Sequence, residues 1–290
     1  MIPIYWGKID NYWGRSMSGN IGGSPLRAYR ADDLAVISHH FHNAYELIFI
    51  EEGEAEFIID GKLRRYRGGD IIFISHLEQH QMRPLSPTYA RYIAIVEPDY
   101  FDRFISDQAL RSIFKNRPAN FENGISLSKN DSNLVCGLMR ECAAEYTERA
   151  LCSELAVMSR LLTIVIMLYR GYTACFPAVP SDRYTASAAL IQSYLDHNYL
   201  EEFTLDDLAA HFHLNKFHLL EVFREVTGYT IKRYIMLKRI SHAKNQLYYT
   251  GNDISQVALE SGFNSTSNFI RAFRRYEHIT PLQFRKLGTY

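Results

Sequence analysis

The feature that most constrains this chain is a repeat in its last third, where a short helix, a tight turn and a second helix occur twice. In the first copy Thr204 precedes LDDLAAHF, and Asn215 precedes KFHLLEVFREVT. In the second copy Asp253 precedes ISQVALES, and Ser265 precedes TSNFIRAFRRY. These residue types favour helix N-termini because their side chains accept hydrogen bonds from unpaired backbone N–H groups. The pattern predicts two helix-turn-helix units.

The two copies are in register along their second helices. Leu219 corresponds to Phe269 and Phe223 to Phe273, while the first helices align with a one-residue slip. Apolar stripes at helical spacing also occur in helical hairpins that pack only for stability, which is the alternative interpretation. Two copies in register, each with a turn and a polar cap, favour tandem helix-turn-helix units. The segment between them, TIKRYIMLKRISHAKNQLYY, predicts one long connecting helix.

The stretch from Thr204 to Arg285 resembles the DNA-binding domain of the AraC/XylS family of transcription regulators. The matching positions are Leu208, Ala209, Leu219, Phe223, Gly228, Arg239, Ala243 and Leu247 in the first part, and Ile254, Val257, Ala258, Gly262, Phe263, Phe269, Arg271, Phe273, Thr280, Pro281, Phe284 and Arg285 in the second. The resemblance implies that each second helix lies in a major groove and that one subunit spans successive grooves. One departure is His278, where the family usually has glycine.

Base readers are expected near the N-terminus of each second helix, at positions that the core does not need. These candidates are Lys216, Phe217, Leu220 and Glu221 in the first unit and Thr266, Ser267, Ile270 and Arg271 in the second. Arginine is the commonest specific reader, and only Arg271 stands early enough in its helix. Glu221 stands where the family often has arginine, and its carboxylate would repel phosphate. Phe217 could contact a thymine methyl or serve in packing.

Charge is distributed unevenly over the two units, although the chain carries 32 Lys+Arg and 32 Asp+Glu. Acidic residues precede the first unit, whereas Arg271, Arg274, Arg275 and Arg285 crowd the second. Arg274 and Arg275 are the predicted contacts to the DNA backbone. The hypothesis is that the second unit dominates DNA affinity.

The sequence from Leu34 to about Val96 predicts a series of short strands. The runs ELIFI, EFIID, DIIFI and YIAIV alternate with turn residues, and Asp60-Gly61 is a strong hairpin signal. Such spacing is typical of an antiparallel sandwich or barrel. After Tyr100, the runs NDSNLVCGLMRECAAEYTER and CSELAVMSRLLTIVIMLYR predict two long helices. Their apolar surface exceeds what a pair can hide, so we expect them to cover the barrel, contact a second subunit, or both.

A cluster of potential metal ligands lies in the strand-rich part. The pattern His40-x-His42-x-x-x-Glu46, with His80 later in the chain, resembles the two cupin motifs. On one strand, positions 40, 42 and 46 would share a face, and a returning strand could bring His80 to the same pocket. Three imidazoles and a carboxylate suit divalent zinc, iron, nickel or manganese.

An organic ligand is the competing interpretation of this pocket. Effector domains of AraC-type regulators resemble cupin barrels with histidines at such positions, and that resemblance implies an organic effector more often than a metal. The histidines would then hydrogen-bond the ligand or one another. Tyr45, with Phe57, Tyr66 or Phe73, would line such a pocket, whereas His39 and His76 are expected to be bystanders.

The expected fold class is α+β: an antiparallel, cupin-like β-barrel with a helical layer, followed by an all-α domain of two helix-turn-helix units joined by a long helix. The expected boundaries are an N-terminal arm at 1–30 that fits no regular element, the effector-binding barrel at 31–100, a helical dimerisation layer at 101–172, a linker at 173–183 and the DNA-binding domain at 184–290.

The expected function is that of a sequence-specific transcription regulator controlled by an effector, and the habit of the family favours an activator. We expect no enzyme activity, no catalytic residues and no required cofactor. Its expected partners are double-stranded DNA, a small molecule, a second copy of itself and RNA polymerase. The cysteines show no C-x-x-C spacing, and the start resembles no secretory signal, so we expect a cytoplasmic protein with reduced thiols. The rival is a metal-dependent cupin isomerase or dioxygenase with a helical appendage. A third hypothesis is a C-terminal domain that chiefly binds protein.

Overall fold

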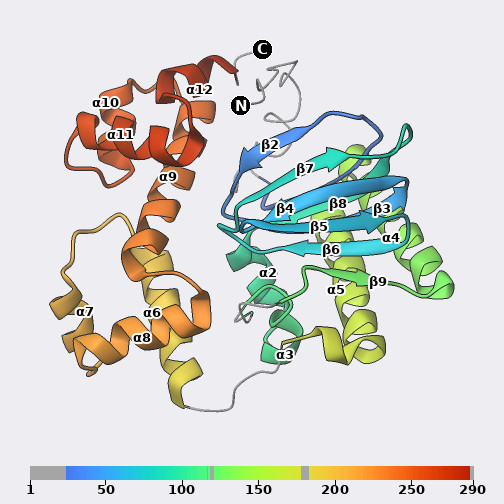
Figure 1. Ribbon diagram of the computed structural model, residues 1–290, viewed down its shortest axis with the longest axis horizontal. Helices are drawn as coiled ribbons and strands as arrows, with labels where there is room; N and C mark the ends of the chain where they lie inside the picture. Colours follow the sequence, from blue (N-terminus) through green and yellow to red (C-terminus); the bar gives the residue numbers. More distant parts are fainter. Residues whose placement is uncertain (1–23, 116, 118–120, 178–182, 288–290) are drawn as a thin grey trace.

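The computed structural model describes residues 24–115, 117, 121–177 and 183–287. Within these residues, two β-sheets and the helices that cover them lie beside an all-helical C-terminal domain (Figure 1). The predicted α+β class is therefore confirmed. The first 23 residues of the predicted N-terminal arm lie outside the described part of the chain.

The strands form two antiparallel sheets that face each other. The five-stranded sheet has the order β1 (Leu26–Ala31), β8 (Ala90–Val96), β3 (Tyr45–Glu52), β6 (Asp70–Ile74) and β9 (Gly124–Ser126). The four-stranded sheet has the order β2 (Ile37–His40), β7 (His80–Pro84), β4 (Glu54–Ile59) and β5 (Lys62–Arg67). The hairpin signal is confirmed between β4 and β5, where Asp60 and Gly61 both have positive φ angles, as a type I′ turn requires.

Side-chain alternation gives the five-stranded sheet two buried faces. On β3, Ile48 and Ile50 point between the sheets, whereas Leu47 and Phe49 point to the outer face. That outer face packs against α4 (Lys129–Glu148) and α5 (Ser153–Gly171), so the two predicted long helices cover the barrel (Figure 1). Glu46 shares the inward face of β3 with Ile48.

The expected boundary of the barrel is wrong by several residues at both ends. β1 pairs with β8 along its whole length, although the sequence through Tyr29 was expected to fit no regular element. Its segment LRAYRA has no β-branched residue, and a partner strand distant in the sequence stabilises it. The helices begin at Pro98 with α2 (Pro98–Phe104), followed by α3 (Gln108–Arg111). β9 interrupts the expected helical layer at 101–172.

The predicted linker at 173–183 is partly helical. A short 3-10 helix spans Thr173–Cys175, and α6 (Arg183–Asn198) begins at the last residue of the expected linker. Residues 178–182 lie outside the described residues.

The C-terminal helices follow the predicted repeat. They are α7 (Leu205–His211), α8 (Lys216–Thr227), the connecting helix α9 (Ile231–Tyr249), α10 (Ile254–Glu260), α11 (Thr266–Glu277) and α12 (Pro281–Leu287). Thr204 and Asp207 form the predicted capping box at the start of α7. Asn215, Asp253 and Ser265 each accept a hydrogen bond from the third backbone N–H of the helix that they precede. All four predicted caps are confirmed.

His278 ends α11 in a left-handed conformation, with φ of 60° and ψ of 1°. Gly228 ends α8 in the same way. A residue with a Cβ atom pays about 1–2 kcal/mol for this backbone conformation. The second helices of both units therefore end in the same backbone conformation, although the second unit has His278 where the first has Gly228.

Arg239 holds the two helix-turn-helix units together. From the middle of α9, its guanidinium donates to the carbonyl oxygens of Tyr199, Glu201 and Gly262 at 2.6–2.8 Å. A Cβ atom at Gly262 would lie only 2.9 Å from Arg239 Nε, so this turn needs glycine. The two units are thus pinned to one connecting helix.

In the part of the chain that the structure describes, no helix combines the length and hydropathy needed to cross a bilayer. All four cysteines are unpaired thiols.

Candidate functional site

The second helix of the first unit, α8, presents a mixed surface. Lys216, Phe217 and Glu221 are exposed, and at 85% exposed Phe217 has no packing role among the described residues. Leu220 is half-buried against the helical core. Lys216 pairs with Asp206 of α7, with a distance of 2.9 Å between Nζ and Oδ2. The predicted reading surface exists in α8, but its cation is already engaged by an acidic neighbour.

The second helix of the second unit, α11, presents a basic surface. Ser267, Ile270 and Arg271 are exposed, and Thr266 is half-buried at the start of the helix. The guanidinium of Arg271 donates to Asn268 Oδ1 one turn earlier. Arg274 and Arg275 are exposed in the last turn. The geometry therefore places every predicted reader of α11 near one end and the predicted phosphate contacts toward the other.

The histidine cluster lies where the two sheets meet at the end of the barrel. His40 on β2 and His80 on β7 stand directly opposite each other, and Glu46 comes from β3 of the other sheet. His42 lies in the turn between β2 and β3. The cluster therefore forms, but not because three residues alternate along one strand: β2 ends at His40 and the chain turns before β3.

The donor atoms are close enough to share one ion. Side-chain nitrogens of His40, His42 and His80 all lie within 4.8 Å of one another. Glu46 Oε2 lies 3.1 Å from His42 Nε2 and 3.4 Å from His80 Nε2. Tetrahedral zinc, with bonds of about 2.1 Å, separates its ligand atoms by about 3.4 Å. A small closing movement of the side chains would complete such a site.

Backbone carbonyls orient two of the imidazoles. His40 Nδ1 lies 2.9 Å from Ser38 O, and His80 Nδ1 lies 2.9 Å from Glu78 O. Each carbonyl favours a proton on Nδ1, which turns the Nε2 lone pair toward the cluster, as in protein metal sites. His42 Nδ1 and Glu46 Oε1 are buried without a hydrogen-bond partner among the described residues. The site thus has oriented donors and unsatisfied polar atoms.

Burial and mutual contact set the charge states of the cluster. Burial lowers the pKa of His40 well below its ordinary value, and it lowers the pKa of His42 against the effect of Glu46. Burial opposes the charge of His80 as well, but contact with Glu46 raises the pKa of His80 above its ordinary value. Burial also opposes ionisation of Glu46, yet His42 and His80 hold its pKa below the ordinary range. Glu46 is therefore a carboxylate, as a metal ligand must be.

Tyr45 does not belong to this pocket, contrary to expectation. It precedes Glu46 on β3 and points to the opposite face, where its ring stacks on Phe114 with centroids 4.5 Å apart. Phe73 lies on the same outer face. Phe57 and Tyr66 do point between the sheets, in contact with each other. The space between the sheets is packed with these rings and aliphatic side chains.

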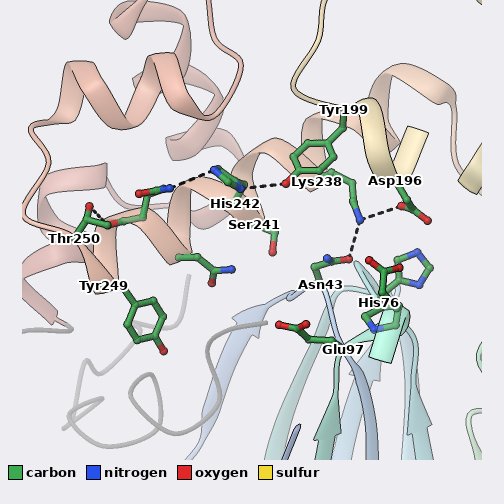
Figure 2. Close-up of a pocket in the computed structure, with 14 residues that line it drawn as sticks. Asn43, His76, Glu97, Asp196, Tyr199, Lys238, Ser241, His242, Tyr249 and Thr250 are labelled. Carbon is green, nitrogen blue, oxygen red and sulfur yellow. Dashed lines mark hydrogen bonds and ion pairs between the residues drawn. The ribbon is translucent and has the colours of Figure 1, made fainter. Parts of the chain in front are cut away.

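The end of the barrel that carries the cluster docks on the connecting helix α9. Lys238 of α9 donates to Asn43 Oδ1 and forms an ion pair with Asp196 of α6 (Figure 2). His76 Nε2 lies 3.1 Å from the hydroxyl of Tyr234, also on α9. Burial lowers the pKa of His76 to about 3, so the imidazole is neutral. His76 lies outside the histidine cluster as expected, but it is a contact between the two domains.

A cavity of about 350 Å³ lies at this boundary (Figure 2). Its walls come from the barrel and α2 on one side and from α6 and α9 on the other, and they are largely polar, with Asn43, Glu97, Asp196, Lys238, Ser241 and His242 among them. Burial raises the pKa of Glu97, with Asp99 adding to the effect. Pockets of this size at domain boundaries commonly hold small ligands.

The sequence carries only weak signals of this domain contact. His76 follows strand β6 and Asn43 precedes strand β3, so both resemble ordinary turn residues. Lys238 lies on a helix whose charged residues are spread around it. Only the pairing of distant segments identifies these residues, and a single sequence does not show that pairing.

The fold and the site define a two-domain protein in which a ligand-binding barrel contacts tandem helix-turn-helix units. A profile of the AraC-like ligand binding domain matches residues 24–165, and a profile of the helix-turn-helix domain matches residues 208–287. The chain belongs to the AraC family of transcriptional regulators.

Similar curated proteins are named as regulators. Uncharacterized HTH-type transcriptional regulators of Staphylococcus aureus are 24% identical over 243 residues, which is 84% of this chain and 31% of the relative. The melibiose operon regulatory protein of Escherichia coli is 36% identical over 95 residues, covering 33% of this chain and 32% of that protein. The chain thus spans about a third of the length of the curated relatives that it matches.

Solved structures of ToxT from Vibrio cholerae share the fold. One matches with a TM-score of 0.58 and 17% identity, covering 91% of this chain and 98% of ToxT. Another, described as bound to an unsaturated fatty acid, matches with a TM-score of 0.60 and 15% identity, covering 91% and 95%. At this identity the likeness establishes the shared architecture of barrel and helical domain.

Proposed function

We propose that this protein is a sequence-specific DNA-binding transcription regulator. The observation that carries the proposal is a pair of exposed helices, α8 and α11, joined by α9 and tied together by Arg239. Two such helices on one rigid connector can enter successive major grooves. The basic surface of α11 supports the second unit as the stronger contact to DNA, while α8 and its acidic neighbours chiefly supply geometry.

The effector acts, in this proposal, at the end of the barrel that faces α9. The polar cavity is lined by residues of the helix that joins the two DNA-reading units. The histidine cluster lies beside Asn43, which accepts a hydrogen bond from Lys238 of the same helix. A ligand that binds one arrangement of the domains more tightly shifts the population toward that arrangement. ToxT, which shares the fold, is described as bound to an unsaturated fatty acid, which supports a small-molecule effector for this architecture.

Homodimer formation, activation through RNA polymerase and action in the cytoplasm complete the proposal. Exposed leucines on α4, α5 and their connection support a dimer contact at the helical layer, namely Leu134, Leu151 and Leu155, at 49%, 96% and 53% exposed. Activation follows the habit of the family, and the curated relatives are bacterial proteins, whose DNA lies in the cytoplasm.

The first test is the salt dependence of DNA binding. The full chain is mixed with a labelled duplex from the region upstream of its own gene, and fluorescence anisotropy gives the affinity at several salt concentrations. A protein with about six to ten phosphate contacts loses about 10³- to 10⁵-fold in affinity between about 50 and 200 mM salt. We expect a steep linear fall of log affinity with log salt. A flat response would leave protein binding as the role of the C-terminal domain.

A metal-dependent cupin enzyme is the second candidate, and the histidine cluster is the observation that favours it. The enzyme alternative predicts turnover that depends on a stoichiometric metal, with His42→Ala abolishing it. The regulator proposal predicts no turnover in a screen of isomerase and dioxygenase substrates with the metal-loaded chain.

A further inference from the structure

The turn between β2 and β3 places consecutive side chains in two different domains. His40 and His42 point into the histidine cluster of the barrel. Phe41, between them, is fully buried in the hydrophobic core of the DNA-binding domain, together with Leu77. The other fully buried members of that core come from α6 through α12 and the turn before α11. The barrel thus inserts two apolar side chains into the domain that carries the helix-turn-helix units.

Phe41 reaches the second recognition helix. Lys244 of α9 donates to Phe41 O at 2.7 Å, and its ammonium lies 4.5 Å from the centroid of the Phe41 ring. Lys244 also forms an ion pair at 2.8 Å with Glu277, near the end of α11. The Phe41 ring meets that of Tyr276, the preceding residue of α11, with centroids 6.4 Å apart. One residue of the barrel therefore contacts both the connecting helix and α11.

The turn itself is tied to the second inserted residue. Leu77 N donates to His42 O at 2.7 Å, and Leu77 O accepts from the hydroxyl of Tyr229, just before α9. A change in the backbone at His42 is therefore transmitted to both insertions. The two insertions are buried among closely packed side chains, and packed interfaces of this kind shift between discrete arrangements rather than deform continuously.

We propose that the cluster of His40, His42, Glu46 and His80 binds a divalent transition-metal ion, and that this ion is an effector that acts on α9 and α11 through Phe41. The inference rests on the proposed DNA-binding function and names a ligand and a route for its regulation. Bonds from the ion to His40 and His42 hold the backbone on both sides of Phe41. The Phe41 ring and carbonyl then keep the position that contacts Lys244 and Tyr276.

The coupling has a measurable size and is reciprocal. Allosteric coupling between two sites changes affinity by about 5- to 150-fold, and DNA must change the affinity for the ion by the same factor. Zinc is a suitable probe because imidazole and carboxylate donors at these spacings match its tetrahedral coordination.

The experiment uses the full chain, Zn²⁺ and a duplex selected by the chain from a random-sequence pool. Equilibrium dialysis with elemental analysis gives the zinc stoichiometry, and anisotropy gives DNA affinity with zinc and after chelation. We expect a single buried Zn²⁺ per chain and at least about a 5-fold change in DNA affinity. His42→Ala removes zinc binding and the response, whereas His197→Ala, which removes an exposed imidazole on α6, keeps both.

Phe41→Ala separates the route from the metal site. This variant should bind zinc with the wild-type stoichiometry, while its DNA response to zinc falls below about 2-fold. Phe41→Leu keeps a large apolar side chain at this position and should retain part of the response. This result would show that the loss in Phe41→Ala does not come from general unfolding. A full zinc response in Phe41→Ala would overturn the proposed route.

The outcomes also separate this inference from the proposed function. A chain that binds DNA in a salt-dependent manner but takes up no zinc, or takes it up with unchanged DNA affinity, overturns the metal effector alone. A chain that binds zinc but never binds DNA overturns the regulator itself, and with it the inference.

Discussion

Lys244→Met is expected to lower the free energy of unfolding by about 3–5 kcal/mol, because it leaves the Glu277 carboxylate buried without its ionic partner. Lys244 is 2% exposed and Glu277 is 7% exposed. Burial lowers the pKa of Lys244 and raises the pKa of Glu277, so each charge depends on the other. Urea unfolding followed by circular dichroism measures the effect.

Two further variants show whether the lost ion pair is responsible. Lys244→Met combined with Glu277→Met removes both charges, and such replacements are often neutral, so most of the lost stability should return. Lys232→Met removes an exposed lysine from the same helix and should change the free energy of unfolding by less than about 0.5 kcal/mol. If Lys244→Met behaved like Lys232→Met, the ion pair would not have the buried character described above.

Arg271→Ala is expected to weaken binding to the preferred DNA sequence by about 1–3 kcal/mol, a loss of about 5- to 150-fold, and to relax specificity at the base that it reads. The guanidinium of Arg271 is exposed near the start of α11 and is oriented by Asn268. Competition between the preferred duplex and single-base variants of it measures both the affinity and the specificity.

Lys216→Ala is the matched variant in the first unit. Because Lys216 already pairs with Asp206, its removal should cost less than the removal of Arg271 and should weaken all sequences about equally. Arg271→Lys should retain charge but lose bidentate recognition of guanine. Intact binding by Arg271→Ala together with loss of binding by Lys216→Ala would contradict the dominance of the second unit.

The helix-turn-helix units could be predicted from the sequence because their signals are local. Thr204, Asn215, Asp253 and Ser265 act within three residues of their own positions, and the apolar spacing describes one face of a single helix. The long helices α4 and α5 were predicted for the same reason. Local propensity and the final fold agree in these segments.

The sequence predicted which residues form the histidine cluster but not how the strands bring them together. The spacing identified His40, His42, Glu46 and His80, but the turn after β2 and the contribution of the two sheets depend on pairings between distant strands. Tyr45 was misplaced because alternation on β3 sends it to the face opposite Glu46. The edge strand β1 was missed because its stability comes from β8 rather than from its own residues.

The contact between the domains could not be predicted from the sequence. Phe41 resembles a barrel core residue, and Lys244 and Glu277 resemble surface charges on amphipathic helices. Their burial arises only when the end of the barrel meets α9 and α11. Residues of this kind have no local pattern, because each partner lies in a different domain.

Hydroxyl-radical footprinting tests most directly whether α8 and α11 of one chain read DNA together. With the full chain on its selected duplex, we expect two protected stretches on one face of the DNA, with centres about one helical turn, about 10 base pairs, apart. Arg271→Ala should reduce protection first in the stretch that α11 contacts. A single short footprint, unchanged by Arg271→Ala, would contradict the claim.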